Sequence, residues 1–484
     1  MTHYDLAIIG SGSGNSLITP YWDDKQVALA DKGIPASGAF GGTCLNVGCI
    51  PTKMFVRPAA LARGPEEAGR LGVEQHTVSS DWPAIRDRIF SRIDAISSGG
   101  RQYREDLTNV HLISEAITLT GAKSFRTASG AEVEAEQMVI AAGSRPVLPL
   151  VPGIELPQVH TSETIMRVEE LPQRILIIGG GYIACEFAGI FAGLGSEVIQ
   201  VNRSIGLMSA LDEEIAAAYS EQAQKNWTVK YQRTLAAVEE RNSEAEAGAA
   251  AGVTAHLVTS DGREEQYDVD VVLVAIGRTP NSDLVGAAEA GLDVLADGRI
   301  AVDEHQRVLS AGEPVEGLYA LGDVSSEAML KHVANHEARV VAHNLEHPDD
   351  LRSPRMHGVP SAVFSHPEIA QVGLTERQAA EAVGAENVTT KTQRYGDTAY
   401  GWAMEDEYGL MKVVADRRNG MILGGHAMGY QSSNLIQPIV HAMSFGQDAY
   451  TAVRGQYWIH PALMEVTENA MLGLDVPVPD DAPL

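Results

Sequence analysis

The stretch that decides the fold stands at the start of the chain, where Tyr4-Asp5-Leu6-Ala7-Ile8-Ile9 runs into Gly10-Ser11-Gly12-Ser13-Gly14-Asn15. The first half predicts a short buried strand, and the second half predicts a glycine turn that opens a helix. Such a turn places backbone N–H groups on a pyrophosphate. A second predicted strand, residues 26–30, ends at Asp31, where an acid would bind the ribose hydroxyls of an adenosine. The stretch therefore predicts a nucleotide site, although Asn15 replaces the third glycine of the fingerprint.

The same pattern recurs further along the chain. Residues 174–178 predict a strand, Gly179-Gly180-Gly181-Tyr182-Ile183-Ala184 a turn, and residues 185–188 the opening of a helix. Two such sites in one chain indicate two Rossmann-like nucleotide-binding domains. The strand predicted at residues 196–201 is followed by Asn202 and Arg203. Because a 2′-hydroxyl is read by a carboxylate and a 2′-phosphate by an arginine, this end favours NADPH. The alternative, that Arg203 is only a solvated loop charge, stays open.

A pair of cysteines follows the first site at close range. Cys44 and Cys49 lie in Gly41-Gly42-Thr43-Cys44-Leu45-Asn46-Val47-Gly48-Cys49-Ile50-Pro51-Thr52-Lys53, and the third cysteine is Cys185. A close pair in a cysteine-poor chain predicts a redox-active disulfide rather than a structural framework. Pro51 suits the first turn of a helix, so Cys49 is expected near a positive helix end that favours a thiolate. A structural disulfide and two inert buried thiols remain the alternatives.

Three further segments connect the predicted domains. Residues 138–146, with Gly143, and residues 271–280, with Gly277, each leave a buried strand through glycine and stop at proline, which predicts connections between the two nucleotide domains. Residues 318–324 predict a strand that ends in Gly322-Asp323, where the acid can reach a polyol chain. Residues 244–252 predict a hairpin tip.

The pattern changes after about residue 355, where alternating strands and amphipathic helices carry no glycine fingerprint. This region predicts a third, α+β domain. Its last part holds His460 and, five positions later, Glu465, which could form an oriented acid/base pair. A structural role for His460 remains the alternative.

Length and charge limit the functions that need considering. A chain of 484 residues suggests about three domains. The net charge of −28 comes from 36 basic and 64 acidic residues, which argues against nucleic acid and anionic membranes as partners. The chain has no apolar run of the roughly 18 residues that a spanning helix needs, and its first residues lack an export signal. We therefore expect a cytoplasmic protein without a metal site.

Taken together, these motifs resemble the FAD-dependent pyridine nucleotide–disulfide oxidoreductases over essentially the whole chain. The resemblance implies an α/β fold with two Rossmann-like domains, for FAD and NADPH, and a C-terminal α+β dimerisation domain. The expected limits are residues 1–155 and 281–355 for the FAD domain, 156–280 for the NADPH domain and 356–484 for the dimerisation domain. The implied FAD residues are Gly10, Gly12, Gly14, Asp31, Gly42, Thr43, Lys53, Gly143 and Asp323. The implied NADPH residues are Gly179, Gly181, Tyr182, Ala184, Arg203 and Gly277.

The resemblance also implies a division of roles within the reaction. Cys49 would remain beside the flavin as a thiolate, and Cys44 would attack the sulfur of the substrate. Lys53 and Glu186 would form an ion pair beside the flavin. His460, oriented by Glu465, would act on Cys44 from the partner subunit, which makes an obligate homodimer the expected active form.

Within the family, residues 40–56, 331–339, 395–406 and 455–465 most resemble the mycothione reductases. The expected substrate is mycothione, a disulfide of a sugar-based thiol with few charges, which needs no arginine cluster, whereas glutathione with its two carboxylates would. NADPH preference stays open in part, because Ser209 stands where a second arginine is usual. Two alternatives remain. The first is an NAD-linked dihydrolipoyl dehydrogenase, and the second is a flavoprotein with a structural or sensing role.

Overall fold

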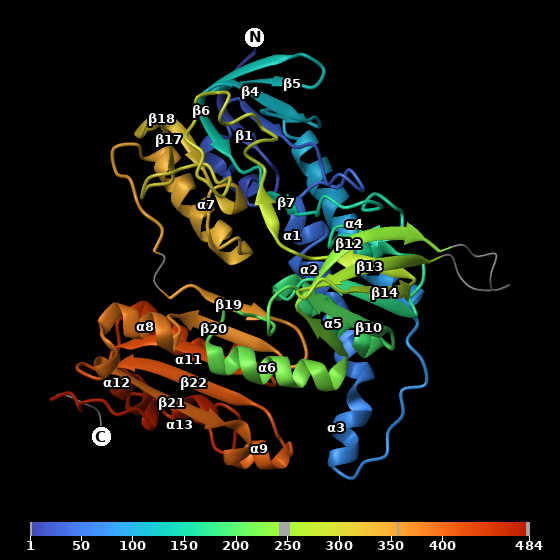
Figure 1. Cartoon of the computed structure of the whole chain (residues 1–484). Coiled ribbons are helices and arrows are strands. Elements are labelled where there is room, and N and C mark those ends of the chain that lie inside the picture. The colour runs from blue at the N-terminus through green and yellow to red at the C-terminus, as the bar shows by residue number, and fades with distance from the viewer. Residues whose placement is uncertain (1, 242–251, 356–357, 481–484) are drawn as a thin grey trace.

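The computed structural model describes residues 2–241, 252–355 and 358–480 (Figure 1). Its first sheet has the strand order β17-β18-β6-β1-β2-β3, with β5 paired to β6 and β4 paired to β5. β1 pairs in parallel with β2 and with β6, and β6 pairs in parallel with β18. The strands are β1 (Thr2–Ile9), β2 (Val27–Ala30), β3 (Val110–Ile113), β4 (Ile117–Gly121), β5 (Ser124–Thr127), β6 (Glu132–Ile140), β17 (Arg307–Ser310) and β18 (Glu313–Ala320). Residues 307–320 thus return to the sheet that the N-terminus begins.

The helices of this region carry the cysteine segment. They are α1 (Gly42–Asn46), α2 (Cys49–Ala62), α3 (Gly64–Arg70), α4 (Trp82–Glu105) and α7 (Lys331–Glu346). Asp81 caps α4, because its carboxylate accepts a hydrogen bond from the backbone N–H of Ala84 at 3.0 Å. α2 packs against α4 and against α5 of the next domain, so the cysteines lie where two domains meet.

The second sheet has the order β11-β10-β9-β15-β8, and all its pairs are parallel. Its elements are β8 (Val159–His160), β9 (Arg174–Ile178), α5 (Tyr182–Leu194), β10 (Glu197–Asn202), α6 (Glu213–Asn226), β11 (Thr228–Tyr231) and β15 (Val271–Val274). An antiparallel sheet of β12 (Arg233–Glu240), β13 (Val253–Thr259) and β14 (Glu264–Val269) adjoins it. The predicted hairpin tip falls between β12 and β13, and residues 244–251 of it lie outside the described residues.

The two predicted connections run side by side. β7 (Ser144–Pro146) and β16 (Arg278–Pro280) form an antiparallel ribbon in which Ser144 pairs with Pro280. The chain therefore leaves the first sheet and returns to it at one place.

The two glycine turns are built alike. Gly10 and Gly179 have φ angles of +104° and +136°, which side chains rarely adopt. A Cβ atom on either would lie 2.2 Å from a carbonyl oxygen, that of Ala141 for Gly10 and that of Ala275 for Gly179. In both turns, a neighbouring strand's backbone passes so close that glycine is required.

The two turns lead into different structures, and here the sequence prediction was wrong. A helix was expected after Gly14, but residues Gly14–Leu17 form one 3-10 turn and Pro20–Trp22 another. Pro20 explains the difference, because a residue before proline is held extended, and Thr19 has φ −92° and ψ 170°. At the second turn, α5 begins at Tyr182 and not at Cys185, so Tyr182, Ile183 and Ala184 belong to its first turn.

The third sheet has the order β19-β20-β23-β22-β21, all antiparallel. Its elements are β19 (Pro360–Val363), β20 (Ile369–Gly373), α8 (Glu376–Val383), β21 (Val388–Arg394), α9 (Ala399–Ala403), β22 (Leu410–Asp416), β23 (Ile422–Met428), α10 (Ser432–Leu435), α11 (Gln437–Phe445), α12 (Ala449–Arg454) and α13 (Glu465–Leu472). The mixed α/β architecture matches the predicted fold class.

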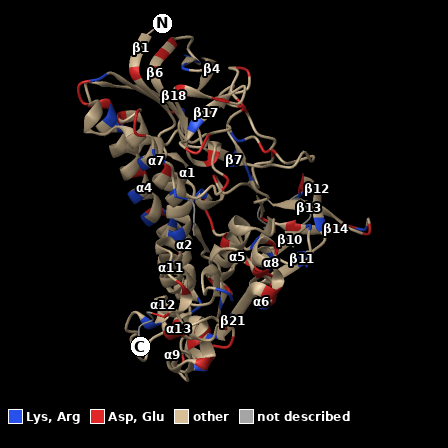
Figure 2. Ribbon diagram, turned by 90° about the vertical axis from the view of Figure 1, so that its left-hand side faces the viewer, with Lys and Arg blue, Asp and Glu red and all other residues tan. Residues whose placement is uncertain are grey.

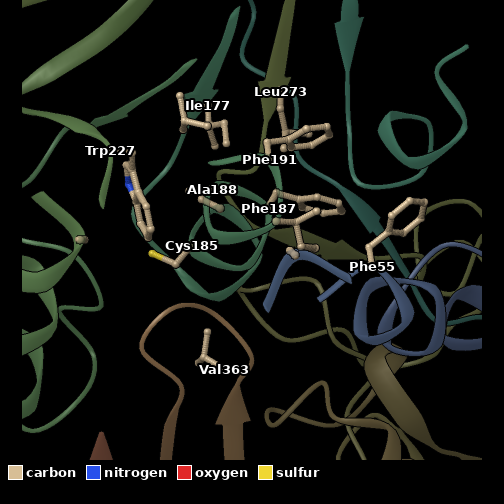
Figure 3. Packing of buried hydrophobic residues seen from close by; sticks show 14 of the residues in the cluster. Phe55, Ile177, Cys185, Phe187, Ala188, Phe191, Trp227, Leu273 and Val363 are labelled. Carbon is tan, nitrogen blue, oxygen red and sulfur yellow. The ribbon is translucent and has the colours of Figure 1, made fainter. Parts of the chain in front are cut away.

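Apolar packing joins the three parts. Figure 3 shows Phe187 and Phe191 of α5 beside Phe55 of α2, with Val363 of β19 below them. Cys185 lies in the same core and points toward Trp227 (Figure 3). Burial raises the pKa of the Cys185 thiol to about 11, so this cysteine is a packing residue.

A buried ion network adds a polar link between the second and third sheets. The ammonium of Lys412 on β22 lies 2.9 Å from Asp212, 2.7 Å from Glu376 and 3.4 Å from Glu214. Asp212 caps α6, and Figure 1 shows α6 lying against the third sheet. One cation therefore fixes the position of α6 relative to β22.

Among the described residues, none of the helices is both long and apolar enough to cross a bilayer. Charged residues are spread over all parts of the molecule, with acidic ones in the majority (Figure 2).

Candidate active site

The two cysteines face each other across a short turn. Cys44 lies in α1, and Cys49 is the first residue of α2, at the helix end where partial positive charge favours an anion. A Cβ atom on Gly48 would lie 3.2 Å from the Cα of Cys44 and 3.0 Å from the carbonyl oxygen of Thr43, so glycine lets the turn close. Both cysteines are free thiols in this structure, and the predicted disulfide is not formed. The sulfurs nevertheless share a hydrogen bond.

This hydrogen bond lowers the pKa of one thiol. Donation from Cys49 lowers the pKa of Cys44 to about 7, and the same bond, with burial, raises the pKa of Cys49. The positive charge of Lys331, at the start of α7, also lowers the pKa of Cys44. The pair therefore shares one proton near neutral pH, and its first deprotonation belongs to both sulfurs. In the protein alone the anion favours Cys44, whereas the family resemblance places the lasting thiolate on Cys49 for its contact with the flavin.

The first glycine turn and the cysteine segment form a narrow backbone cradle. A Cβ atom on Gly42 would lie 2.6 Å from the Cα of Gly12, so only glycine allows the two backbone segments to come this close. Asp31 accepts hydrogen bonds from the backbone N–H of Ser11 at 3.0 Å and of Gly33 at 2.6 Å. The Ser11 hydroxyl also donates to Asp31 and accepts from the N–H of Gly41 at 2.7 Å. A glycine turn of this kind, with an acid at the end of the next strand, has the groups that the pyrophosphate and ribose of FAD require.

The ribbon of β7 and β16 contacts Asp323 through Ser144. The hydroxyl of Ser144 donates to the Asp323 carboxylate at 2.6 Å, and Arg278 donates to that hydroxyl at 2.7 Å. Gly143, with φ +68°, makes the sharp turn that delivers Ser144. Asp323 and Gly143 were predicted from the sequence, but Ser144 and Arg278 were missed, because their contacts span distant segments.

The second glycine turn opens toward the first turn of α5. Gly181 precedes Tyr182, and Ala184 is buried against the space that a Cβ on Gly179 would take, at 3.3 Å. Asn202 closes the next loop by donating to the carbonyl of Gly206 at 2.7 Å. Arg203 is exposed, and in the part of the chain that the structure describes it has no hydrogen bond or ion pair.

Two further residues predicted for this second nucleotide site are Gly277 and Tyr182. Gly277 has φ +130° and leads from β15 toward the ribbon. The hydroxyl of Tyr182 accepts a hydrogen bond from Gln371 at 3.4 Å. The exposed guanidinium of Arg203 remains available for a phosphate.

The ion-pair partner of Lys53 differs from the prediction. The expected direct ion pair with Glu186 is not formed among the described residues. The Lys53 ammonium instead lies 4.0 Å from Glu368 and 3.4 Å from the centroid of the Phe364 ring. Glu186 accepts a hydrogen bond from the backbone N–H of Phe364 at 2.8 Å. Phe364 contacts both side chains, and Glu368, which was not predicted, pairs with the ammonium.

Glu186 has an unusual carboxyl group. Its burial raises the pKa to about 7, from 4.5, with the charge of Glu368 adding to the effect. Between about pH 4.5 and 7, the Glu186 carboxyl carries a proton in the folded chain but has lost it in the unfolded chain. Stability from this group is therefore fully present below about pH 4.5 and is lost as the pH rises to about 7.

We expect Glu186→Gln to remove that pH dependence. On raising the pH from 5 to 8, the free energy of unfolding of the FAD-loaded native protein should fall on the order of 2 kcal/mol more than that of the variant. Urea unfolding at the two pH values measures this difference. Glu313→Gln, on the exposed start of β18, is the control and should behave as the native protein. Equal pH dependence in native protein and Glu186→Gln would contradict the assignment.

The predicted acid/base pair is present. The Nδ1 atom of His460 lies 2.7 Å from Glu465, which also accepts the N–H of Ala462 at 3.1 Å. The hydrogen bond from His460 lowers the pKa of Glu465, so the carboxylate stays ionised. The imidazole is 71% exposed, and its neighbours Tyr457 and Ile459 are also exposed. The pair is thus oriented and open to another molecule.

His460 and the cysteines lie far apart within one chain. In both views α1 and α2 lie near the middle of the molecule, below the first sheet, whereas α13, which starts at Glu465, lies in the lower part, away from the N-terminus (Figures 1 and 2). The structure of one chain therefore does not bring Cys44 and His460 together.

Comparisons with known proteins agree along the whole chain. A family profile described as "Pyridine nucleotide-disulphide oxidoreductase" matches residues 4–338, and one for the dimerisation domain of the same group matches residues 359–471. The chain is 46% identical to a mycothione reductase of Mycobacterium tuberculosis, covering 98% of this chain and 100% of that protein.

More distant relatives also align along nearly the whole chain. A glutathione reductase of Burkholderia cepacia is 31% identical, with 96% and 97% of the two chains covered. A dihydrolipoyl dehydrogenase of Haloferax volcanii is 30% identical, with 97% of each covered. Among solved structures, the Cu(II) complex of the HOCl-induced flavoprotein disulfide reductase RclA from Escherichia coli superposes with a TM-score of 0.82. Its identity is 25%, over 98% of this chain and 99% of that one.

Proposed function

The chain belongs to the pyridine nucleotide-disulphide oxidoreductase family, and on that premise we propose that it reduces mycothione to mycothiol with NADPH as the electron donor. As a family member it is an oxidoreductase that uses FAD and a nicotinamide nucleotide. The observation that carries the proposal is the thiol pair of Cys44 and Cys49 at the start of α2, in a chain so similar over its length to a mycothione reductase.

The proposed reaction balances as NADPH, one proton and one disulfide giving NADP⁺ and two thiols. Gly12 and Gly42 would hold FAD, which would supply the transfer of the electron pair from the nicotinamide to the cysteines. The Cys44 thiolate then attacks one substrate sulfur, the substrate S–S bond breaks, and the leaving thiolate takes a proton from His460 of the partner subunit. Cys49 attacks Cys44 in turn, which re-forms their disulfide and releases the second thiol.

Two residues support this reaction through position alone. Glu465 holds the imidazole by its Nδ1 atom and leaves the other nitrogen to exchange a proton. Gly48 keeps the two sulfurs within reach of each other.

A homodimer follows from the separation of the two half-sites. The dimerisation domain is present, and the exposed segment Tyr457–His460 can enter a second copy, whereas it cannot reach the cysteines of its own chain. We propose an active site shared between subunits, in a cytoplasmic enzyme. We also propose the domain limits 1–155 with 281–355, 156–280, and 356–484. The sheet order supports them, because β17 and β18 return to the first sheet.

The experiment that tests the proposed function compares mycothione, glutathione disulfide and lipoamide as substrates, each with NADPH and with NADH. Mycothione with NADPH should give the highest kcat/KM. If the oxidation of dihydrolipoamide by NAD⁺ is faster than the reduction of any of the three disulfides, the chain is a dihydrolipoyl dehydrogenase. If no disulfide is reduced although the flavin is, the protein has a sensing or structural role.

Nucleotide choice should depend on Arg203. Its guanidinium is exposed after β10, and Asn202 rather than an acid precedes it in the sequence. Arg203→Glu should therefore lower kcat/KM for NADPH by roughly ten- to a hundredfold and favour NADH. Arg377→Glu, on the exposed face of α8, is the control for the change in net charge. A native enzyme that prefers NADH at equal concentration would refute this assignment.

A further inference from the structure

The third domain reaches Lys53 and Glu186 through the segment between β19 and β20, residues 364–368. β19 is an edge strand of the third sheet and packs against α5 (Figure 1). Phe364 donates its backbone N–H to Glu186 at 2.8 Å, and its ring centroid lies 3.4 Å from the Lys53 ammonium. The hydroxyl of Ser365 donates to the carbonyl oxygen of Cys185 at 2.7 Å. The segment is therefore fixed to α2 and to α5.

Glu368 is held in place from within the third domain. Its Oε1 atom accepts a hydrogen bond from the backbone N–H of Ser433, in α10, at 2.6 Å. Its carbonyl oxygen accepts one from the N–H of Gly429 at 2.8 Å. The second carboxylate oxygen, Oε2, lies 4.0 Å from the Lys53 ammonium, and the Glu368 side chain is 18% exposed against 49% for Lys53. An anchored carboxylate of this kind can set the position of a longer, flexible and more exposed lysine.

Two carboxyl groups act on this ammonium, and they differ in charge. Burial raises the pKa of Glu186 to about 7, so a large share of its carboxyl groups is uncharged near neutral pH. Burial lowers the pKa of Lys53, and the negative charge of Glu368 opposes this effect more than that of Glu186 does. Glu368 is therefore the stronger counter-ion of Lys53.

The other charged groups around Lys53 are cations. Arg57 lies one helical turn beyond Lys53 on α2, and Arg88 and Arg92 of α4 line the same cleft. Their charges disfavour the charged form of the lysine. Cys49, one turn before Lys53, carries no charge while it is part of the disulfide. The titratable and charged groups that face Lys53 are thus Cys49, Arg57, Arg88, Arg92, Glu186 and Glu368.

We propose that Glu368 is the positioning residue of Lys53, so that a side chain of the third domain holds the ammonium beside the flavin and supports the transfer of electrons from NADPH. A cation fixed at this place stabilises the negative charge that a flavin gains when it is reduced. The inference rests on the proposed electron path through FAD, and it does not depend on which disulfide is reduced.

Titration of Lys53 in the FAD-loaded enzyme tests the contact itself. After reductive ¹³C-methylation, the NMR signal of Lys53 is assigned by its loss in Lys53→Met, and its pKa is measured from the change of the signal with pH. Glu368→Gln should lower this pKa by about one unit, because the Coulombic support is lost while the burial remains. The glutamine keeps an oxygen for the N–H of Ser433, so the segment should stay in place. Glu186→Gln should lower the pKa less, and Glu368→Asp should recover part of the native value.

Stopped-flow reduction of the flavin by NADPH gives a second measurement. Glu368→Gln should lower the rate roughly tenfold near pH 8, because the ammonium is no longer held in position. The alkaline fall of the rate should also move to lower pH, since Lys53 loses its proton earlier. Adding Glu368→Gln to Lys53→Met should slow the reaction no further than Lys53→Met alone, because Glu368 acts through Lys53.

The control removes one negative charge from an exposed pair of the same domain. Glu381 pairs with Arg377 on α8, so Glu381→Gln should leave the titration of Lys53 and the rate of flavin reduction near their native values.

Three results would overturn the proposal. The first is a fall in the Lys53 pKa that is as large in Glu186→Gln as in Glu368→Gln, which would return the ion pair to Glu186. The second is an unchanged titration of Lys53 in Glu368→Gln. The third is a further loss of rate when Glu368→Gln is added to Lys53→Met. An enzyme that reduces none of the disulfides would refute the proposed function, but the titration and the flavin half-reaction would still test the role of Glu368.

Discussion

Replacing Cys44 or Cys49 with serine should abolish disulfide reduction, whereas reduction of the flavin by NADPH should survive. A serine hydroxyl cannot accept the electron pair or form the mixed disulfide, so no bypass remains. The two variants should differ in their spectra. Cys44→Ser leaves Cys49 against the oxidised flavin and should show a long-wavelength absorbance band at neutral pH, and Cys49→Ser should not.

The spectra decide between two assignments of the thiolate. In the protein alone the shared hydrogen bond lowers the pKa of Cys44, whereas the family resemblance places the lasting thiolate on Cys49. A band in Cys44→Ser alone supports Cys49 as the flavin-side sulfur. A band in Cys49→Ser alone would exchange the two roles. Cys185→Ser is the control, since this buried thiol should leave both spectrum and turnover near native values.

His460→Ala should lower disulfide turnover by roughly two to four orders of magnitude. The imidazole is the group that Glu465 orients, and without it the leaving thiolate has no positioned proton donor. Stopped-flow reduction of the flavin by NADPH should be nearly unchanged, because hydride transfer needs no proton from this site. Loss of both half-reactions would mean that the variant disturbs the fold rather than the proton transfer.

Mixed dimers test where His460 acts. Chains with His460→Ala and chains with Cys44→Ser are each inactive, but a dimer of one of each has one site with both residues intact. Activity should return after subunit exchange, up to about a quarter of the native value for random mixing if the sites act independently, because half of the dimers carry one intact site of two. No recovery after verified exchange would show that His460 works within its own chain or not at all.

The sequence was sufficient to predict features that depend on residues close together in the chain. Gly10 and Gly179 follow apolar strands, and the structure shows why glycine is needed, since a Cβ there would meet the backbone of the neighbouring strand. The connections at Gly143 and Gly277 were predicted from the same pattern, and they pair as β7 and β16. His460 and Glu465 are close in sequence, so their contact could also be predicted.

The features that were missed depend on residues far apart in the chain. Glu368 meets Lys53 only because residues 364–368 fold back onto α2. The missing helix after Gly14 is different, because Pro20 was visible in the sequence and its effect on Thr19 was overlooked.

The chain leaves the first sheet at β7 and returns to it at β16, and this path affects how the protein folds during synthesis. β6 ends at Ile140, and its parallel neighbour β18 begins only at Glu313. During synthesis from the N-terminus, all strands of the second sheet, residues 159–274, emerge between these two. The domain that contains the second sheet, which we call the inner domain, can therefore fold first as a unit. Meanwhile the edge of β6 that later pairs with β18, at Met138–Ile140, remains unpaired. An apolar strand edge in that condition is a site for wrong pairing, so the nascent chain is most prone to aggregate after the inner domain has formed and before residue 320 has left the ribosome.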